Sequence, residues 1–178
     1  MIPHNGSTYR CIRYDHSDEP RILNVFFFWK AAVLLAEQTQ SKKPQLPETF
    51  SEPFCSLVCN LVHKVGAGID AFRLDETGQV VAAIEIKATI TTSGFTDVKR
   101  DLGFDELYWL SLASYNSLSY EIHRITREQI LRFVEASNTQ RDRATVNLAK
   151  IVESLSLPPI FKGRIGIIAE NLASPTAA

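Results

Sequence analysis

The chain has 178 residues, of which 45% are apolar and 22% are charged, so we expect one globular domain, residues 1–178, with a substantial core. Its net charge of −1 argues against a protein that coats nucleic acid through bulk positive charge, but not against one whose basic residues line a single groove. Its three cysteines form no disulfide framework and no signal peptide is visible, which predicts a cytoplasmic protein.

The first part of the chain, residues 1–21, is polar and mixed, and we expect an N-terminal arm or loop with a short strand at Thr8 to Tyr14. A partly ordered terminus and an arm that contacts DNA or a partner are both compatible with it. A helix is predicted from Asn24, as N-cap, to about Gln38. This helix is apolar almost all round and too short to span a membrane. We therefore expect it either at the centre of the core or against a second copy of the chain.

A second helix is predicted from Ser51, as N-cap, through about Lys64. Cys55, Cys59 and His63 recur every four residues in it, a pattern that raises the question of a zinc site. Three such positions climb about 12 Å along a helix and cannot all reach one ion. A core face that contains two small cysteines is the better interpretation.

The chemistry is predicted on a hairpin. Val80 to Lys87 is rich in β-branched residues and follows a turn signal, and Ile69 to Leu74 can form its partner strand. Because side chains alternate along a strand, Glu85 and Lys87 point the same way, and Asp70 can face them from the partner strand. Two carboxylates supply oxygen ligands for Mg²⁺, and a lysine can orient the attacking water. A surface hairpin with a Glu–Lys pair is the alternative.

Gly68-Ile69-Asp70, followed after fourteen residues by Glu85-Ile86-Lys87, resembles the PD-(D/E)XK nuclease motif, with isoleucine where the family name has proline. The following Ala88-Thr89 and the stretch from Phe104 to Leu110 look like type II restriction endonucleases of that superfamily. The likeness covers a core at residues 51–134.

The resemblance implies an α/β, restriction-endonuclease-like fold with a mixed central β-sheet flanked by α-helices. It implies that Asp70 and Glu85 hold Mg²⁺ and that Lys87 positions the water. Enzymes of this family often bring one more acidic residue from a preceding helix, and Glu52 is the candidate for that role here.

Residues 88–100 are dense in hydroxyl groups and end in two basic residues, so we expect a polar loop beside bound DNA. Thr89, Lys99 and Arg100 are its candidate DNA contacts, although an ordinary polar loop would have the same composition.

Downstream, strands are predicted at Leu107 to Leu112 and at Tyr120 to Ile125. A capping box of Thr126 and Gln129 opens a helix that runs to about Ala136. A polar, basic loop follows at residues 137–145, then a helix at residues 144–155 and a last strand at residues 160–168. The loop carries four side chains suited to reading bases, unless it is simply a solvated loop: Asn138, Gln140, Arg141 and Arg143.

These features lead to the hypothesis of a Mg²⁺-dependent endonuclease that cuts double-stranded DNA at a short, palindromic sequence, in the manner of a type II restriction enzyme. A palindromic site matches a two-fold symmetric protein, so we expect a homodimer. No nucleotide-binding spacing occurs, and no nucleotide cofactor is expected. Two alternatives remain open, namely a structure-selective repair or recombination nuclease and a non-catalytic DNA-binding module of the same fold.

Overall fold

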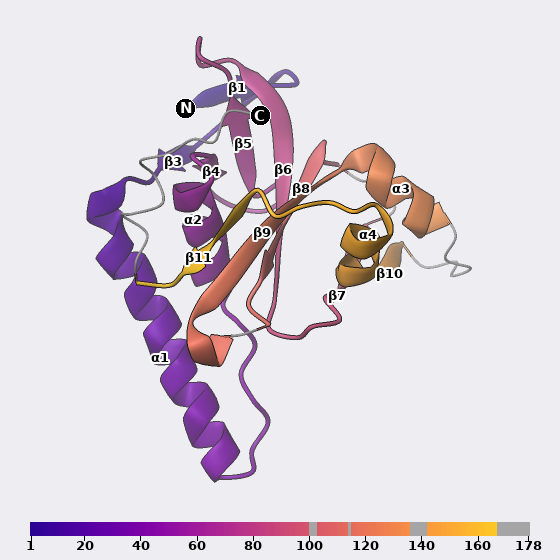
Figure 1. Ribbon diagram of the computed structural model, residues 1–178. Coiled ribbons are helices and arrows are strands. Elements are labelled where there is room, and N and C mark those ends of the chain that lie inside the picture. Colours follow the sequence, from indigo (N-terminus) through magenta and orange to yellow (C-terminus); the bar gives the residue numbers. More distant parts are fainter. Residues whose placement is uncertain (100–102, 114, 136–141, 167–178) are drawn as a thin grey trace.

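The computed structural model describes residues 1–99, 103–113, 115–135 and 142–166 (Figure 1). A seven-stranded sheet forms its centre, with the strand order β11-β9-β8-β6-β5-β4-β3. Its strands, in chain order, are β3 (Cys11–Arg13), β4 (Val62–Lys64), β5 (Ala71–Leu74), β6 (Val80–Thr89), β8 (Glu106–Ser111), β9 (Ser119–Thr126) and β11 (Phe161–Arg164). Strands β6 and β8 are parallel, and the other neighbours in this sheet are antiparallel. The predicted mixed central sheet is confirmed.

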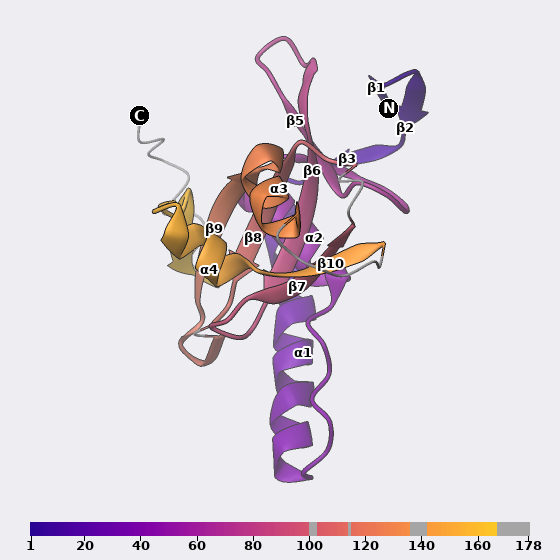
Figure 2. The ribbon, with the colours of Figure 1, turned by 90° about the vertical axis from the view of Figure 1, so that its right-hand side faces the viewer.

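Different elements cover the two faces of this sheet: in Figure 1 they lie to its left and to its right, and Figure 2 looks from the right-hand side. One face carries the helices α1 (Glu19–Gln38) and α2 (Glu48–Val58). The other carries the helices α3 (Arg127–Glu135) and α4 (Leu148–Ser154), together with a separate antiparallel ribbon of β7 (Phe95–Lys99) and β10 (Arg143–Asn147). Because side chains alternate along each strand, the sheet supplies apolar residues to two cores. The predicted α/β fold, with helices on both faces of the sheet, is confirmed.

Aromatic side chains hold α2 against the sheet. The ring of Phe50 lies 5.0 Å from that of Phe26 on α1 and 5.0 Å from that of Phe54, whose ring lies 5.0 Å from Tyr120 on β9. All four side chains are at most 2% exposed. Aromatic rings at these separations contribute packing beyond the area that they bury. The position of α2 relative to β6 is therefore fixed, and this fixes the acidic residues that α2 carries.

The second helix differs from its prediction at both ends. It begins at Glu48, one turn before Ser51, and it ends at Val58 rather than near Lys64. Asn60 adopts a left-handed conformation (φ 51°) and closes the helix end. His63 therefore lies on strand β4 and not on the helix, so the three-residue helical row that includes it does not exist. All three cysteines are free.

The N-terminal segment is more regular than the predicted arm. β1 (Ile2–His4) and β2 (Ser7–Tyr9) form a hairpin whose turn, Asn5-Gly6, has positive φ angles at both residues. This turn geometry matches the twist of paired strands. β3 then joins the edge of the main sheet, and a 3₁₀ turn at His16–Asp18 leads into α1.

The first helix begins at Glu19 rather than after Asn24, with a proline in its first turn. It is not the centre of the core, because it is buried along only one side. Phe28 is 78% exposed and Leu35 is 60% exposed on the other side. Within the described part of the chain, no helix has the length and apolarity needed to cross a membrane.

Two corrections concern the second half of the chain. Residues 88–100 are not one loop, because β6 continues to Thr89 and β7 follows at Phe95–Lys99. Residues 144–147 belong to strand β10 rather than to a helix. Helix α4 starts only at Leu148, after Asn147, whose side-chain oxygen accepts from the amide of Lys150 at 2.9 Å.

The remaining predictions in this half agree with the structure where it is described, apart from the length of the last strand. The capping box is confirmed, since the amide of Thr126 donates to Oε1 of Gln129 at 2.8 Å and the amide of Gln129 donates to Oγ1 of Thr126 at 3.4 Å. A 3₁₀ turn at Tyr115–Ser117 connects β8 to β9. The last strand, β11, is shorter than predicted and covers Phe161–Arg164: residues 160, 165 and 166 are not part of it, and residues 167 and 168 of the predicted strand lie outside the described residues.

Candidate active site

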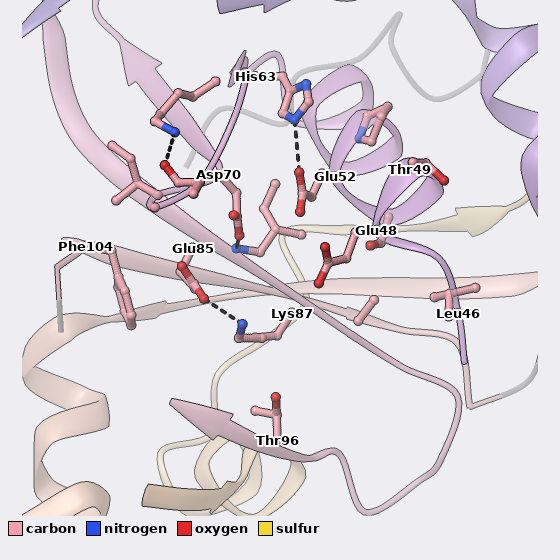
Figure 3. Close-up of a pocket in the computed structure, with 18 of the residues that line it drawn as sticks. Leu46, Glu48, Thr49, Glu52, His63, Asp70, Glu85, Lys87, Thr96 and Phe104 are labelled. Carbon is pink, nitrogen blue, oxygen red and sulfur yellow. Dashed lines mark hydrogen bonds and ion pairs between the residues drawn. The ribbon is translucent and has the colours of Figure 1, made fainter. Parts of the chain in front are cut away.

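A groove of about 1590 Å³ runs along β6, between α2 and the β7–β10 ribbon. It exists because β5 begins at Ala71, opposite Ile84, so that the later residues of β6 have a neighbouring strand only on the β8 side. Asp70, Glu85 and Lys87 line this groove (Figure 3). The hairpin thus brings together the three residues that the sequence pattern singled out.

The Asp70 carboxylate is held against β6 by the backbone. Its Oδ2 accepts from the amide of Ile86 at 2.7 Å, and its own amide donates to the carbonyl of Ile84 at 2.9 Å. Burial, followed by the negative charge of Glu85, raises the pKa of Asp70 to about 7. The groove therefore holds a carboxylate whose negative charge is poorly stabilised by the protein alone.

Glu85 and Lys87 point to the same side of β6, as their spacing predicts, and form an ion pair with Nζ 2.6 Å from Oε1. Both side chains are partly buried, with 20% and 28% exposed. They lie on the sheet face that also carries the ribbon, since Glu85 pairs with Leu107 and Lys87 with Trp109 across the β6–β8 ladder. A positive group thus lies beside two carboxylates at the floor of an open groove.

The donor set fits Mg²⁺ rather than zinc. Among the described residues, no three or more His, Cys, Asp or Glu side chains gather closely enough to enclose a metal ion. Mg²⁺ does not need such a cage, because it keeps several waters and is bound by one or two carboxylates together with substrate phosphates. Asp70 and Glu85 could supply these carboxylates, and a divalent cation would offset the burial and the Glu85 charge that raise the pKa of Asp70.

Glu52 also faces the groove, from α2, and its negative charge contributes to the raised pKa of Asp70. It is fixed by a chain of hydrogen bonds that the sequence did not predict. Glu52 Oε2 lies 3.0 Å from His63 Nε2, and His63 Nδ1 lies 3.0 Å from the hydroxyl of Tyr14. These two contacts tie the imidazole ring to both neighbours and hold the Glu52 carboxylate in place.

Glu48, one helical turn before Glu52, lines the groove as well (Figure 3). Glu48 was not predicted as a site residue, because the second helix was expected to begin only at Ser51. A helix that includes Glu48 places it four residues before Glu52, on the same helix face. His63 and Tyr14 lie far apart in the sequence from each other, and no local pattern connects them.

Some of the residues predicted to contact DNA line the groove, and others lie outside the described residues. Lys99 and Arg143 line the groove from opposite strands of the ribbon, where they are cross-strand neighbours. Thr89 also lines it, but its hydroxyl accepts from Trp109 Nε1 at 2.9 Å and so has a structural partner. The other four candidates lie outside the described residues: Arg100, Asn138, Gln140 and Arg141.

A comparison with protein families gives a match over much of the chain. The family model described as Bsp6I restriction endonuclease matches residues 14–145, well over half of the chain. The matched range includes the hairpin, helix α2 and strand β7. Searches of curated proteins and of solved structures gave no match.

Proposed function

The chain belongs to the Bsp6I restriction endonuclease family, and on that premise we propose that it cuts double-stranded DNA at a short, palindromic sequence in a Mg²⁺-dependent reaction. The observation that carries the proposal is the meeting of Asp70, Glu85 and Lys87 in one groove. Their order and spacing resemble the PD-(D/E)XK motif, and we assign the chain to that superfamily on this ground. The family match favours this function over a repair nuclease or a non-catalytic DNA-binding module.

In the proposed reaction, Asp70 and Glu85 would hold the metal ion and Lys87 would position the attacking water. The bound ion would acidify a water and stabilise the charge that develops on the scissile phosphate. The Nζ of Lys87 lies 2.6 Å from Oε1 of Glu85, so its ammonium group lies beside a carboxylate that would hold the ion. Glu52, held by His63, also lines the groove and would contribute a further carboxylate to the site.

Cleavage of a mixed-sequence plasmid tests this proposal. Purified protein is incubated with Mg²⁺ or with EDTA, alongside Lys87→Ala and the control Lys162→Ala. Lys162 is a suitable control because it also pairs with a glutamate, Glu121, at 2.6 Å, but on β11 and outside the groove. We expect discrete fragments that require Mg²⁺, are lost in Lys87→Ala and persist in Lys162→Ala. Full cleavage by Lys87→Ala would show that the roles are wrongly assigned.

The exposed side of α1 supports the homodimer that a palindromic site requires. Phe28 and Leu35 are separated by seven residues, two helical turns, and so share a face, and Phe27 and Leu34 repeat this spacing beside them. All four are more than 40% exposed. Figure 1 shows the second half of α1 extending beyond the sheet, where a second copy can reach it. We propose that two copies of α1 pack against each other around the two-fold axis.

Light scattering coupled to size exclusion tests this interface. We expect a dimer for the natural chain and a monomer for Phe28→Glu, because a buried unpaired charge is costly. Val81→Glu introduces the same charge at an exposed apolar position on β6 and should remain dimeric. A Phe28→Glu protein that is still a dimer would place the interface elsewhere.

A further inference from the structure

The β7–β10 ribbon has one apolar and one polar face. Val98, Ala144 and Val146 are at most 3% exposed and pack into the second core. The alternate positions point away from the core and form three cross-strand pairs: Lys99 with Arg143, Asp97 with Thr145, and Phe95 with Asn147. Strand alternation therefore presents a row of mostly polar side chains on the surface of the protein.

This polar face borders the groove that holds the candidate active site. Phe95, Asp97 and Lys99 of β7 and Arg143 of β10 line that groove. In Figure 3, Thr96 of β7 lies across the site from α2, so the ribbon and the helix form opposite walls. A duplex whose phosphate reached the floor of the groove would therefore lie beside the ribbon.

The middle pair of the row offers only hydrogen-bond acceptors. The hydroxyl of Thr145 donates to Asp97 Oδ1 at 2.6 Å, which uses its one proton. Among the described residues, no other hydrogen bond uses the second oxygen of Asp97 or the lone pairs of Thr145, and Asp97 belongs to no salt bridge there. Both residues are exposed.

A carboxylate in this place is unfavourable for contact with phosphate, because DNA phosphates repel it. It is suited to one kind of DNA contact, which is acceptance of a hydrogen bond from an exocyclic amino group in the major groove, at cytosine N4 or adenine N6. The major groove is wide enough to admit a two-stranded ribbon. Lys99 and Arg143, at one end of the row, can contact phosphates or guanine edges.

We propose that the β7–β10 ribbon enters the major groove and that the Asp97–Thr145 pair reads an exocyclic amino group of one base pair in the recognition site. This inference rests on the proposed function and adds a specificity-determining pair to it. The pair contributes to the choice of sequence and takes no part in hydrolysis.

The test compares the cutting preferences of three variants with those of the natural chain. Sequencing the ends cut by the natural chain first gives its site, and duplexes with every single base-pair substitution then give the discrimination at each position. For Asp97→Ala and for Thr145→Val, we expect discrimination to fall by about 5- to 150-fold at one position of the site and its symmetry mate. Glu153→Ala, which removes an exposed carboxylate on α4 outside the groove, should leave every position unchanged.

Each outcome decides between a reading role and a structural one. If Asp97→Ala slows cleavage of all duplexes equally and leaves every base preference intact, the pair only holds the ribbon together and the proposal is overturned. If the natural chain cuts no DNA, the proposed function fails instead. The ribbon is then tested by selecting bound duplexes from a random library in Ca²⁺. A preference that is shared by the natural chain and Asp97→Ala would overturn the reading role there too.

Discussion

Asp70→Asn should make the metal-free protein more stable and inactive at the same time. In the unfolded chain Asp70 ionises near its usual pKa of 3.8, whereas in the groove burial and Glu85 raise that pKa to about 7. At pH values between these two pKa values, Asp70 binds a proton in the native state but not in the unfolded state. The free energy of unfolding therefore falls as the pH rises from about 4 to about 7, and this contribution is constant above.

The size of the effect follows from the pKa difference. At about 1.4 kcal/mol per pKa unit, ionised Asp70 costs the native protein about 4 kcal/mol at pH 8 and much less at pH 5. Asparagine removes the charge and keeps an acceptor for the amide of Ile86. Asp70→Asn should thus exceed the natural chain in stability by up to about 4 kcal/mol at pH 8, with the difference vanishing near pH 4.

Urea unfolding in EDTA between pH 5 and pH 8 measures this difference. Asp75→Asn is the matched control, because Asp75 lies in the turn of the same hairpin and its pKa is lowered by the hydroxyl of Thr77. That variant should be less stable than the natural chain at pH 8, the opposite sign. Added Mg²⁺ should stabilise the natural chain and leave Asp70→Asn unchanged. Stability curves for Asp70→Asn and the natural chain that run parallel across this pH range would refute the reasoning.

Three further predictions follow from other contacts. His63→Ala frees the Glu52 side chain and should weaken Mg²⁺ binding by about tenfold in calorimetric titration, with the fold intact by circular dichroism; unchanged binding would separate Glu52 from the metal site. Gly94→Ala should cost about 1–3 kcal/mol in urea unfolding, because the added Cβ would lie 2.6 Å from Trp109 and the residue has φ +59°. Phe54→Ala should cost about 3–5 kcal/mol in the same assay, and a cost below 1 kcal/mol would mean that the cavity collapses.

Sequence reasoning succeeded where neighbouring residues determine the outcome. The hairpin around Glu76-Thr77-Gly78 follows from turn chemistry and β-branched composition, and alternation along one strand places Glu85 and Lys87 on the same side. The capping box at Thr126 is also local. Prediction from the sequence failed at helix ends, where a left-handed Asn60 ended a helix that the apolar pattern alone would have continued.

The ribbon shows a different kind of failure. Residues 95–99 and 143–147 each contain too few apolar residues to indicate a strand, and each is stabilised by pairing with the other across more than forty residues. Such long-range pairing depends on the tertiary fold and overrides local propensity. Asp97 could not be distinguished from an ordinary loop acid until its partner strand was known.

The sequence by itself determined the hairpin that carries the candidate active site, because Asp70, Glu85 and Lys87 are brought together by one turn and one strand. Only the tertiary structure decided the rest of the groove. Glu48 and Glu52 reach it because aromatic packing fixes α2 on the sheet, and Tyr14 and His63 meet because β3 pairs with β4. The physical reason is that short-range geometry is set by backbone sterics, whereas contacts between distant segments depend on which apolar surfaces bury each other.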